Sequence, residues 1–143
     1  MTVREAAPGD AAAVTALLAE LGYPDEAQRV RRRLEAFSAD PRSFVLVAEE
    51  GAGSVAGLVS GSVMPLLHED GRWCRVSALV VADGRRRSGV GRALVAATEE
   101  RARAAGCRYI EVTSGERPER QTAHAFYEAL GLAEVSRRFS KTL

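Results

Sequence analysis

The fold is decided by one stretch, which reads Leu79-Val80-Val81-Ala82-Asp83-Gly84-Arg85-Arg86-Arg87-Ser88-Gly89-Val90-Gly91-Arg92-Ala93-Leu94. An apolar run typical of a buried strand leads into a basic turn, and the turn leads into a helix. The first N–H groups of a helix have no partners within the helix, and the helix dipole favours an anion there. Gly89 and Gly91 lack a Cβ atom, so a phosphate can approach their backbone closely. The stretch therefore indicates an anion-binding strand–turn–helix unit.

A tight turn with solvated arginines would produce the same pattern. The spacing matches neither the GxxxxGK[ST] loop of P-loop proteins nor the GxGxxG loop of dinucleotide-binding proteins. Spacing alone therefore leaves both a phosphate site and a purely structural turn open.

Strands and helices are expected on both sides of this unit. Apolar periodicity and turn residues predict strands at 2–6, 44–49, 55–63, 73–81, 108–113 and 132–140, and helices at 11–21, 26–37, 89–105 and 118–130. Asp10 is expected to cap the first helix by accepting hydrogen bonds from N–H groups of its first turn. Short loops make the second, third and fourth strands antiparallel, whereas a helical connection makes the fifth parallel to the fourth.

These elements predict one α/β (α+β) domain that covers residues 1–143. We expect a mixed central sheet of six to seven strands, with about four helices on both faces. A chain of 143 residues is long enough to bury a core without disulfide or metal.

Composition excludes some classes of partner. The net charge is +1, which gives no electrostatic reason to expect nucleic acid. No apolar stretch approaches the roughly 20 residues of a membrane span, and the N-terminus lacks a signal-peptide core, so we expect a cytoplasmic protein without a membrane partner. Cys74 and Cys107 are expected to be reduced thiols. The run His68-Glu69-Asp70 is expected to be a polar turn, so no metal site is predicted.

Two segments resemble the GNAT superfamily of N-acetyltransferases. Arg86-x-x-Gly89-x-Gly91, after its apolar strand, resembles the pyrophosphate-binding motif of that family. Ala123-His124-Ala125-Phe126-Tyr127-Glu128-Ala129-Leu130-Gly131-Leu132 resembles its AxxFYxxxGF segment, with Leu132 where phenylalanine is usual. The order of strands and helices is similar over essentially the whole chain. The resemblance implies an N-acetyltransferase that moves an acetyl group from acetyl-CoA to a primary amine by direct attack in a ternary complex.

The resemblance also implies where acetyl-CoA binds. A V-shaped opening is expected between the strands at 73–81 and 108–113, where the pantetheine arm would pair with the backbone of Leu79, Val80 and Val81. An N–H near Val80 would polarise the thioester carbonyl. The pyrophosphate would contact the residues of the turn, namely Arg86, Arg87, Ser88, Gly89, Val90, Gly91 and Arg92.

Tyr127 is the residue to which the resemblance assigns a chemical role. In family members with this motif the tyrosine protonates the departing CoA thiolate, and phenols and thiolates have similar basicity. The helical spacing of Ala123, Phe126, Tyr127 and Leu130 also fits a residue that only packs in the core.

The general base is less clearly indicated. Many relatives carry a glutamate on the strand before the phosphate loop, but residues 73–79 contain no carboxylate. Glu111, Glu20 and His124 are the candidates, with Glu111 preferred, and a water chain would serve as well. The missing carboxylate keeps one alternative open, a catalytically inactive acyl-CoA-binding or regulatory module.

The acceptor pocket is expected to lie near the first two helices and the loops after the meander strands. Glu20, Tyr23 and Trp73 would line it, together with residues 114–120. Its carboxylates would suit a cationic amine, and we expect a small-molecule amine in preference to a peptide or protein amine. Relatives dimerise through terminal strands, so a homodimer is also an expectation of the resemblance.

Overall fold

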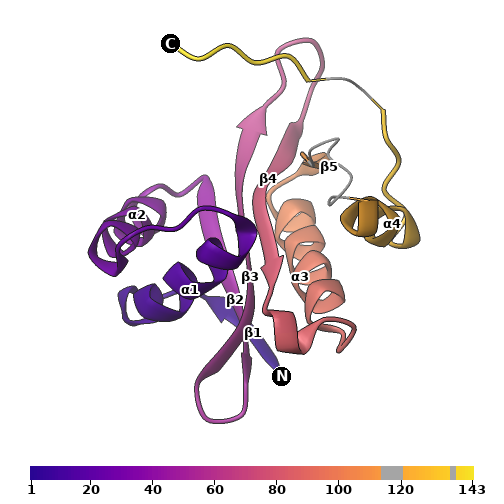
Figure 1. The fold of residues 1–143 in the computed structure, drawn as a ribbon. Coiled ribbons are helices and arrows are strands. Elements are labelled where there is room, and N and C mark those ends of the chain that lie inside the picture. The colour runs from indigo at the N-terminus through magenta and orange to yellow at the C-terminus, as the bar shows by residue number, and fades with distance from the viewer. Residues whose placement is uncertain (114–120, 136–137) are drawn as a thin grey trace. The chain divides into compact units, whose positions relative to one another are not determined.

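The computed structural model describes residues 1–113, 121–135 and 138–143. The chain divides into two compact units, Met1–Thr113 and Ser114–Leu143, which are described separately (Figure 1). That the whole chain forms a single domain therefore stays a prediction.

The first unit contains a five-stranded sheet in the order β1-β2-β3-β4-β5. Its strands are β1 (Thr2–Glu5), β2 (Ser43–Glu50), β3 (Ser54–Pro65), β4 (Arg72–Val81) and β5 (Cys107–Val112). The first three pairings are antiparallel, and β5 runs parallel to β4. The directions of β2, β3, β4 and β5 agree with the prediction from the lengths of their connections.

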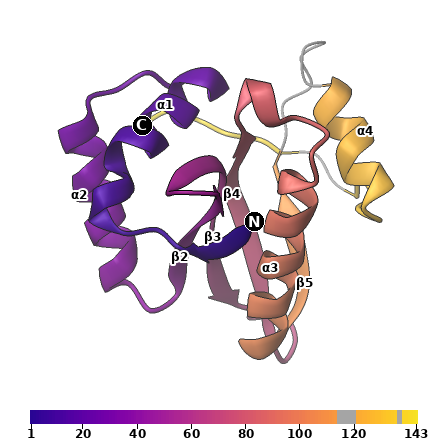
Figure 2. The same cartoon turned by 90° about the horizontal axis from the view of Figure 1, so that it is seen from below.

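Three helices of this unit cover the sheet on both faces (Figure 2). They are α1 (Ala11–Leu21), α2 (Ala27–Ala39) and α3 (Val90–Ala104), accompanied by the short 3-10 helices η1 (Pro8–Asp10) and η2 (Asp83–Arg85). Helices α1 and α2 lie on one face and α3 lies on the other.

Each face of the sheet has its own apolar core, because neighbouring residues of a strand point to opposite faces. Leu46 and Ala48 pack in the cluster that contains Val90 and Leu94 of α3. Val47, between them, packs in the cluster formed with α1 and α2. The strands are therefore buried on both faces, which explains their nearly continuous apolar sequences.

Gly57 lets α3 approach the sheet closely. A Cβ atom there would lie 2.9 Å from Cγ1 of Val90 and 3.2 Å from Cδ1 of Leu94. Any larger residue would push the first turn of α3 away from β3. The position of the strand–turn–helix unit thus depends on a glycine that lies outside it.

The second unit contains α4 (Gln121–Ala129), which begins just after the undescribed residues 114–120. Gly131 ends this helix in the left-handed region, with φ of 86°, and the Leu132 N–H donates to the Tyr127 oxygen. This glycine ending was predicted and is confirmed. Over the residues that the structure describes, every helix is too short or too polar to cross a membrane.

The prediction of six to seven strands is wrong, because the sheet has five. The missing strand is the one expected at 132–140, whose described residues, 132–135 and 138–140, lie outside any strand. Its large apolar residues, Leu132, Val135 and Phe139, recur at spacings of three and four. A strand face requires a spacing of two, so no consistent apolar face forms.

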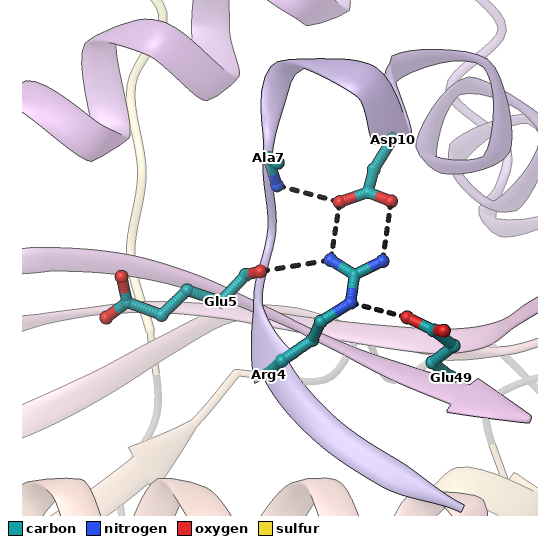
Figure 3. Close-up of polar contacts among 5 residues, drawn as sticks. All are labelled: Arg4, Glu5, Ala7, Asp10 and Glu49. Atoms are coloured by element: carbon teal, nitrogen blue, oxygen red, sulfur yellow. Dashed lines mark hydrogen bonds and ion pairs between the residues drawn. The ribbon is translucent and has the colours of Figure 1, made fainter. Parts of the chain in front are cut away.

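Asp10 is the N-cap residue of α1, as predicted, but the hydrogen bonds predicted for its side chain are wrong. Its carboxylate makes no capping hydrogen bond to the first turn of α1. Instead one oxygen accepts from the Ala7 N–H at 2.7 Å, and both oxygens accept from the guanidinium of Arg4, at 2.8 and 2.9 Å (Figure 3). A guanidinium presents two parallel donors to a carboxylate, and this pair wins over a single capping bond.

Candidate active site

Strands β4 and β5 separate part of the way along the sheet. Their pairing joins Arg72–Val76 to Cys107–Val112, where β5 ends. Strand β4 continues to Val81, so its last five residues have no strand partner on that side within residues 1–113. The β4–β5 pairing therefore ends in the region where the family resemblance predicts an opening, and the opening itself stays a prediction.

The hydrogen-bond alternation of β4 shows which of its groups face β3. The Ala82 N–H donates to the Ala56 oxygen at 2.9 Å. In an antiparallel pair every second position is hydrogen-bonded, so Val80 also directs its N–H and C=O toward β3. The Val80 oxygen lies 2.9 Å from the place of a Cβ on Gly57 of β3, in agreement with this direction.

Leu79 and Val81 consequently direct their N–H and C=O groups away from β3, into the opening. Their side chains are half-buried against the α3 core, whereas their backbone groups lie at the edge of β4 that does not pair with β3. The N–H expected near Val80 thus belongs to one of its two neighbours.

The turn after β4 has an unusual backbone. Arg87 has φ of 63° and Gly89 has φ of 88°, and Arg87 is the only described non-glycine residue with positive φ. Left-handed residues between ordinary ones gather successive N–H groups into a concave nest that suits an anion. Gly89 precedes the first turn of α3, and no atom lies within 4 Å of the place of its Cβ.

In this nest, the groups that could contact an anion belong more to the backbone than to the side chains. Val90 and Gly91 are buried, with the Val90 side chain fully inside the α3 core. They can therefore offer a ligand only their N–H groups at the helix N-terminus. Backbone groups are thus offered both by the edge of β4 and by the N-terminus of α3, with residues 82–88 between them.

The arginines of the turn fall into two groups. Arg85 pairs with Glu50 at 3.1 Å, and Arg86 pairs with Asp83 at 2.7 Å. Arg87 and Arg92 are exposed and form no ion pair with another described residue. The Ser88 hydroxyl donates to the Arg85 oxygen and so helps to shape the turn. Within the part of the chain that the structure describes, these two guanidinium groups have no carboxylate partner and could contact phosphate oxygens.

Glu20 lies against this turn. Its carboxylate accepts from the Asp83 N–H at 3.1 Å, which connects the end of α1 to η2. Tyr23, two residues beyond α1, is 70% exposed. Trp73 lies near the start of β4, whereas Asp83 follows its end, so Glu20 and Trp73 occupy opposite ends of the strand. The structure therefore does not bring these predicted acceptor residues together.

Trp73 instead neighbours Glu111. Its ring stacks on Tyr109 of β5, with centroids 6.2 Å apart and planes at 28°. Glu111 follows two residues later on the same face of β5 and lies opposite Arg75 in the register. This places the preferred base candidate one residue before the end of the β4–β5 pairing.

Sequence reasoning missed a bulge in β4. Ser60 pairs with Ala78 and Gly61 pairs with Val76, so Ser77 is the extra residue. The hydroxyls of Ser77 and Ser60 lie 2.9 Å apart, and Ser60 is 8% exposed. The bulge lies directly after Val76, which forms the last pair with β5. A bulge of this kind has no short sequence motif from which it could be predicted.

Tyr127 lies on α4 beside Phe126, with ring centroids 5.7 Å apart. Its expected role, like those of the other site residues, stays a prediction. His124 lies on the same helix, and the expected acceptor loop at 114–120 falls outside the described residues.

Comparison with known proteins gives matches over nearly the whole chain. The family described as "Acetyltransferase (GNAT) family" matches residues 11–132. A curated relative, the aminoglycoside N(6')-acetyltransferase type 1 of Stenotrophomonas maltophilia, is 34% identical over 142 residues, which cover 95% of this chain and 88% of the relative.

Solved structures share the fold. A putative acetyltransferase from Agrobacterium tumefaciens has a TM-score of 0.88 at 25% identity, covering 100% of both chains. A transcriptional regulator from Bacillus halodurans has a TM-score of 0.89 at 24% identity, covering 99% of both. The family match and the curated relative show an acetyltransferase enzyme, and these solved structures show that the fold is shared.

Proposed function

Because the chain belongs to the GNAT acetyltransferase family, we propose that it transfers an acetyl group from acetyl-CoA to a primary amine of a small molecule. The observation that carries this proposal is the open edge of β4, which leads directly into the nest before α3. One continuous run of backbone groups can bind the pantetheine arm and the pyrophosphate.

The backbone of Leu79 and Val81 would hold the pantetheine amides, and an N–H of this pair would polarise the thioester carbonyl. The N–H groups around Gly89 and at the start of α3 would hold the pyrophosphate. Arg87 and Arg92 would add charge, while Arg85 and Arg86 keep the turn in shape through their own carboxylate partners.

The acyl transfer we propose is direct. The amine nitrogen attacks the thioester carbon, a C–N bond forms, and the C–S bond breaks with its electron pair on sulfur. Tyr127 would donate its phenolic proton to this sulfur, and the amine proton would pass to a base. The products are the N-acetylated amine and CoA.

Glu111 is the preferred base because of its place in the register. It precedes Val112, the last residue of β5 that pairs with β4, so it lies beside the end of the β4–β5 pairing. Glu20 is less suitable, since its carboxylate already accepts from the Asp83 N–H at the far end of β4. Amino-sugar amines deserve to be tested first as acceptors, because the curated relative is an aminoglycoside acetyltransferase.

Calorimetric titration with acetyl-CoA tests the proposal. The native protein is expected to bind it with a micromolar Kd, and Gly89→Asp is expected to weaken binding at least about 100-fold through charge repulsion and blocked access. Gly106→Asp is the matched control, because Gly106 has a similar φ of 78° and equally open surroundings at the other end of α3. Absence of binding by the native protein would overturn the proposal.

Tyr127→Phe tests the expected proton donor. Turnover should fall about 100-fold, the range of general acid catalysis, while acetyl-CoA binding stays unchanged. The measurement is steady-state release of CoA thiol, with calorimetry on the same preparation. Unchanged turnover would mean that Tyr127 only packs.

A further inference from the structure

The face of β4 and β5 opposite α3 carries polar and aromatic side chains. Cys74 and Val76 belong to the α3 core, so the alternating residues of β4 point to the other face. We call this the β4–β5 polar face, and its members are Trp73, Arg75, Ser77, Tyr109 and Glu111.

The α1–α2 core does not extend over the β4–β5 polar face. Among described residues, its β4 members are Ala78 and Val80, which follow the bulge, and it takes none from β5. Tyr109 is 40% exposed, and Trp73, Arg75 and Glu111 are half-buried. Within residues 1–113 the α1–α2 core therefore leaves this face uncovered, and the face adjoins the end of the β4–β5 pairing.

The side chains of this face form ordered rows across three strands. One row contains Met64, Trp73 and Tyr109, and the next contains Ser62, Arg75 and Glu111. The Ser60–Ser77 pair follows, where the β4–β5 pairing has ended. An aromatic row, a charged row and a hydroxyl row thus lead toward the expected thioester.

The charged row contains two groups of opposite sign that do not pair. Arg75 and Glu111 are register neighbours, yet neither makes an ion pair or side-chain hydrogen bond with any described residue. Half-buried charges usually have partners, because removal from water costs free energy. One positive and one negative group held side by side are complementary to a ligand that carries both charges.

We infer that the acceptor carries an anionic group in addition to its amine, and that Arg75 binds this group. This inference rests on the proposed function, since it concerns the acceptor of that reaction. Glu111 contacts the amine, and the Trp73–Tyr109 pair packs against the apolar side of the acceptor. The face has no excess of negative charge, so it does not select a polycation.

The spacing of the rows limits the size of the acceptor. Residues on one face of a strand repeat every roughly 6.6 Å. The amine must reach the row of Ser77, and Arg75 lies one row before it. The anionic group therefore lies within about 7 Å of the amine, as in an amino sugar phosphate or an amino acid.

Acetyl transfer to matched acceptors tests this inference. Glucosamine and glucosamine 6-phosphate share their amine and ring and differ in one anionic group. At saturating acetyl-CoA, kcat/KM is expected to be roughly 10- to 100-fold higher for the phosphate, the range of a charge-assisted pair. Arg75→Met should remove this preference by raising KM for the phosphate alone.

Arg42→Met provides the matched control, because Arg42 is an exposed arginine with no place in the proposed site. It should keep the native preference. The inference is overturned if a polycationic aminoglycoside is the better acceptor, or if Arg75→Met leaves the ratio of the two acceptors unchanged.

Binding measurements separate this inference from the proposed function. If the native protein does not bind acetyl-CoA, the proposed function itself is refuted. If acetyl-CoA binds but neither acceptor is turned over, titration of glucosamine 6-phosphate into the CoA-saturated protein decides. Binding that Arg75→Met abolishes supports the inference, and absence of binding overturns it.

Discussion

Two arginine-containing regions of the same unit differ in whether their guanidinium groups have carboxylate partners. At the start of the chain, Arg4 donates to both oxygens of Asp10, to Glu49 at 2.5 Å and to the Glu5 oxygen (Figure 3). In the turn before α3, Arg87 and Arg92 have no ion-pair partner among the described residues. Both regions join a strand to a helix.

An arginine that is paired with carboxylates has a structural role, whereas an arginine without such a partner is available to a ligand. The Arg4 cluster ties β1 to β2 and to η1, and it satisfies nearly all the donors of one guanidinium. The turn places an unpaired arginine on a left-handed backbone position, which costs roughly 1 kcal/mol. We therefore expect mutations in the first region to change stability, and mutations in the second to change affinity.

Arg4→Met should give the largest effect on stability. The Asp10 side chain is only 11% exposed and would lose its cation, while Arg4 itself is 35% exposed. Because the pair is only partly buried, we expect a loss of about 2 kcal/mol in the free energy of unfolding, which is less than the loss for a fully buried pair. Urea denaturation measures it. Arg31→Met breaks an exposed pair with Glu35 and should cost less than about 0.5 kcal/mol.

Arg87→Gln should reduce acetyl-CoA affinity about tenfold, or about 1.4 kcal/mol, without lowering stability. Arg85→Gln is the comparison, because Arg85 is already paired with Glu50 and should contribute little directly. Calorimetry measures both, and the Arg87 contribution should shrink as salt is raised. Equal losses for the two variants would contradict the division of the turn into paired and unpaired arginines.

The smallest expected effect is the acid response of the Arg4 cluster. The hydrogen bonds from Arg4, and secondarily the Ala7 N–H, hold the pKa of Asp10 below its ordinary value of 3.8. A carboxyl whose pKa is lowered on folding stabilises the protein above its unfolded pKa, and this contribution disappears as the pH falls through the folded pKa. The native protein should therefore lose stability below pH 3.8.

The effect is checked by measuring the free energy of unfolding of the native protein and of Arg4→Met above and below this pH. The variant should show a shallower acid loss, because its Asp10 pKa returns toward the ordinary value. Asp40 also has a lowered pKa, caused first by the Arg42 N–H, and its share should be the same in both proteins. Parallel acid curves would show that the Arg4–Asp10 pair contributes nothing to the response.

Much of the fold followed from periodicity. The apolar run at 79–81, the glycines that end the helices and the short hairpin at 51–53 gave the elements and the strand directions correctly. The strand at 132–140 failed because its apolar residues do not alternate. Asp10 failed because Arg4, six residues earlier, competes for its carboxylate, and local capping rules do not include such a partner.

The candidate site was accessible to sequence reasoning only in part. The turn from Arg85 to Arg92 was found through its own local pattern. The bulge at Ser77 and the stacking of Trp73 on Tyr109 were missed, because both depend on which residues of another strand lie alongside. Glu20 and Trp73 were expected in one pocket, but they lie at opposite ends of β4.

The sequence by itself determined the order of elements, the strand–turn–helix unit and the family resemblance, because these depend on residues close together in the chain. Only the tertiary structure decided which arginines are paired, where β4 leaves β5, and that Arg75 and Glu111 stand side by side without a bond. Register and burial bring distant residues together, and a linear pattern of side chains does not specify them.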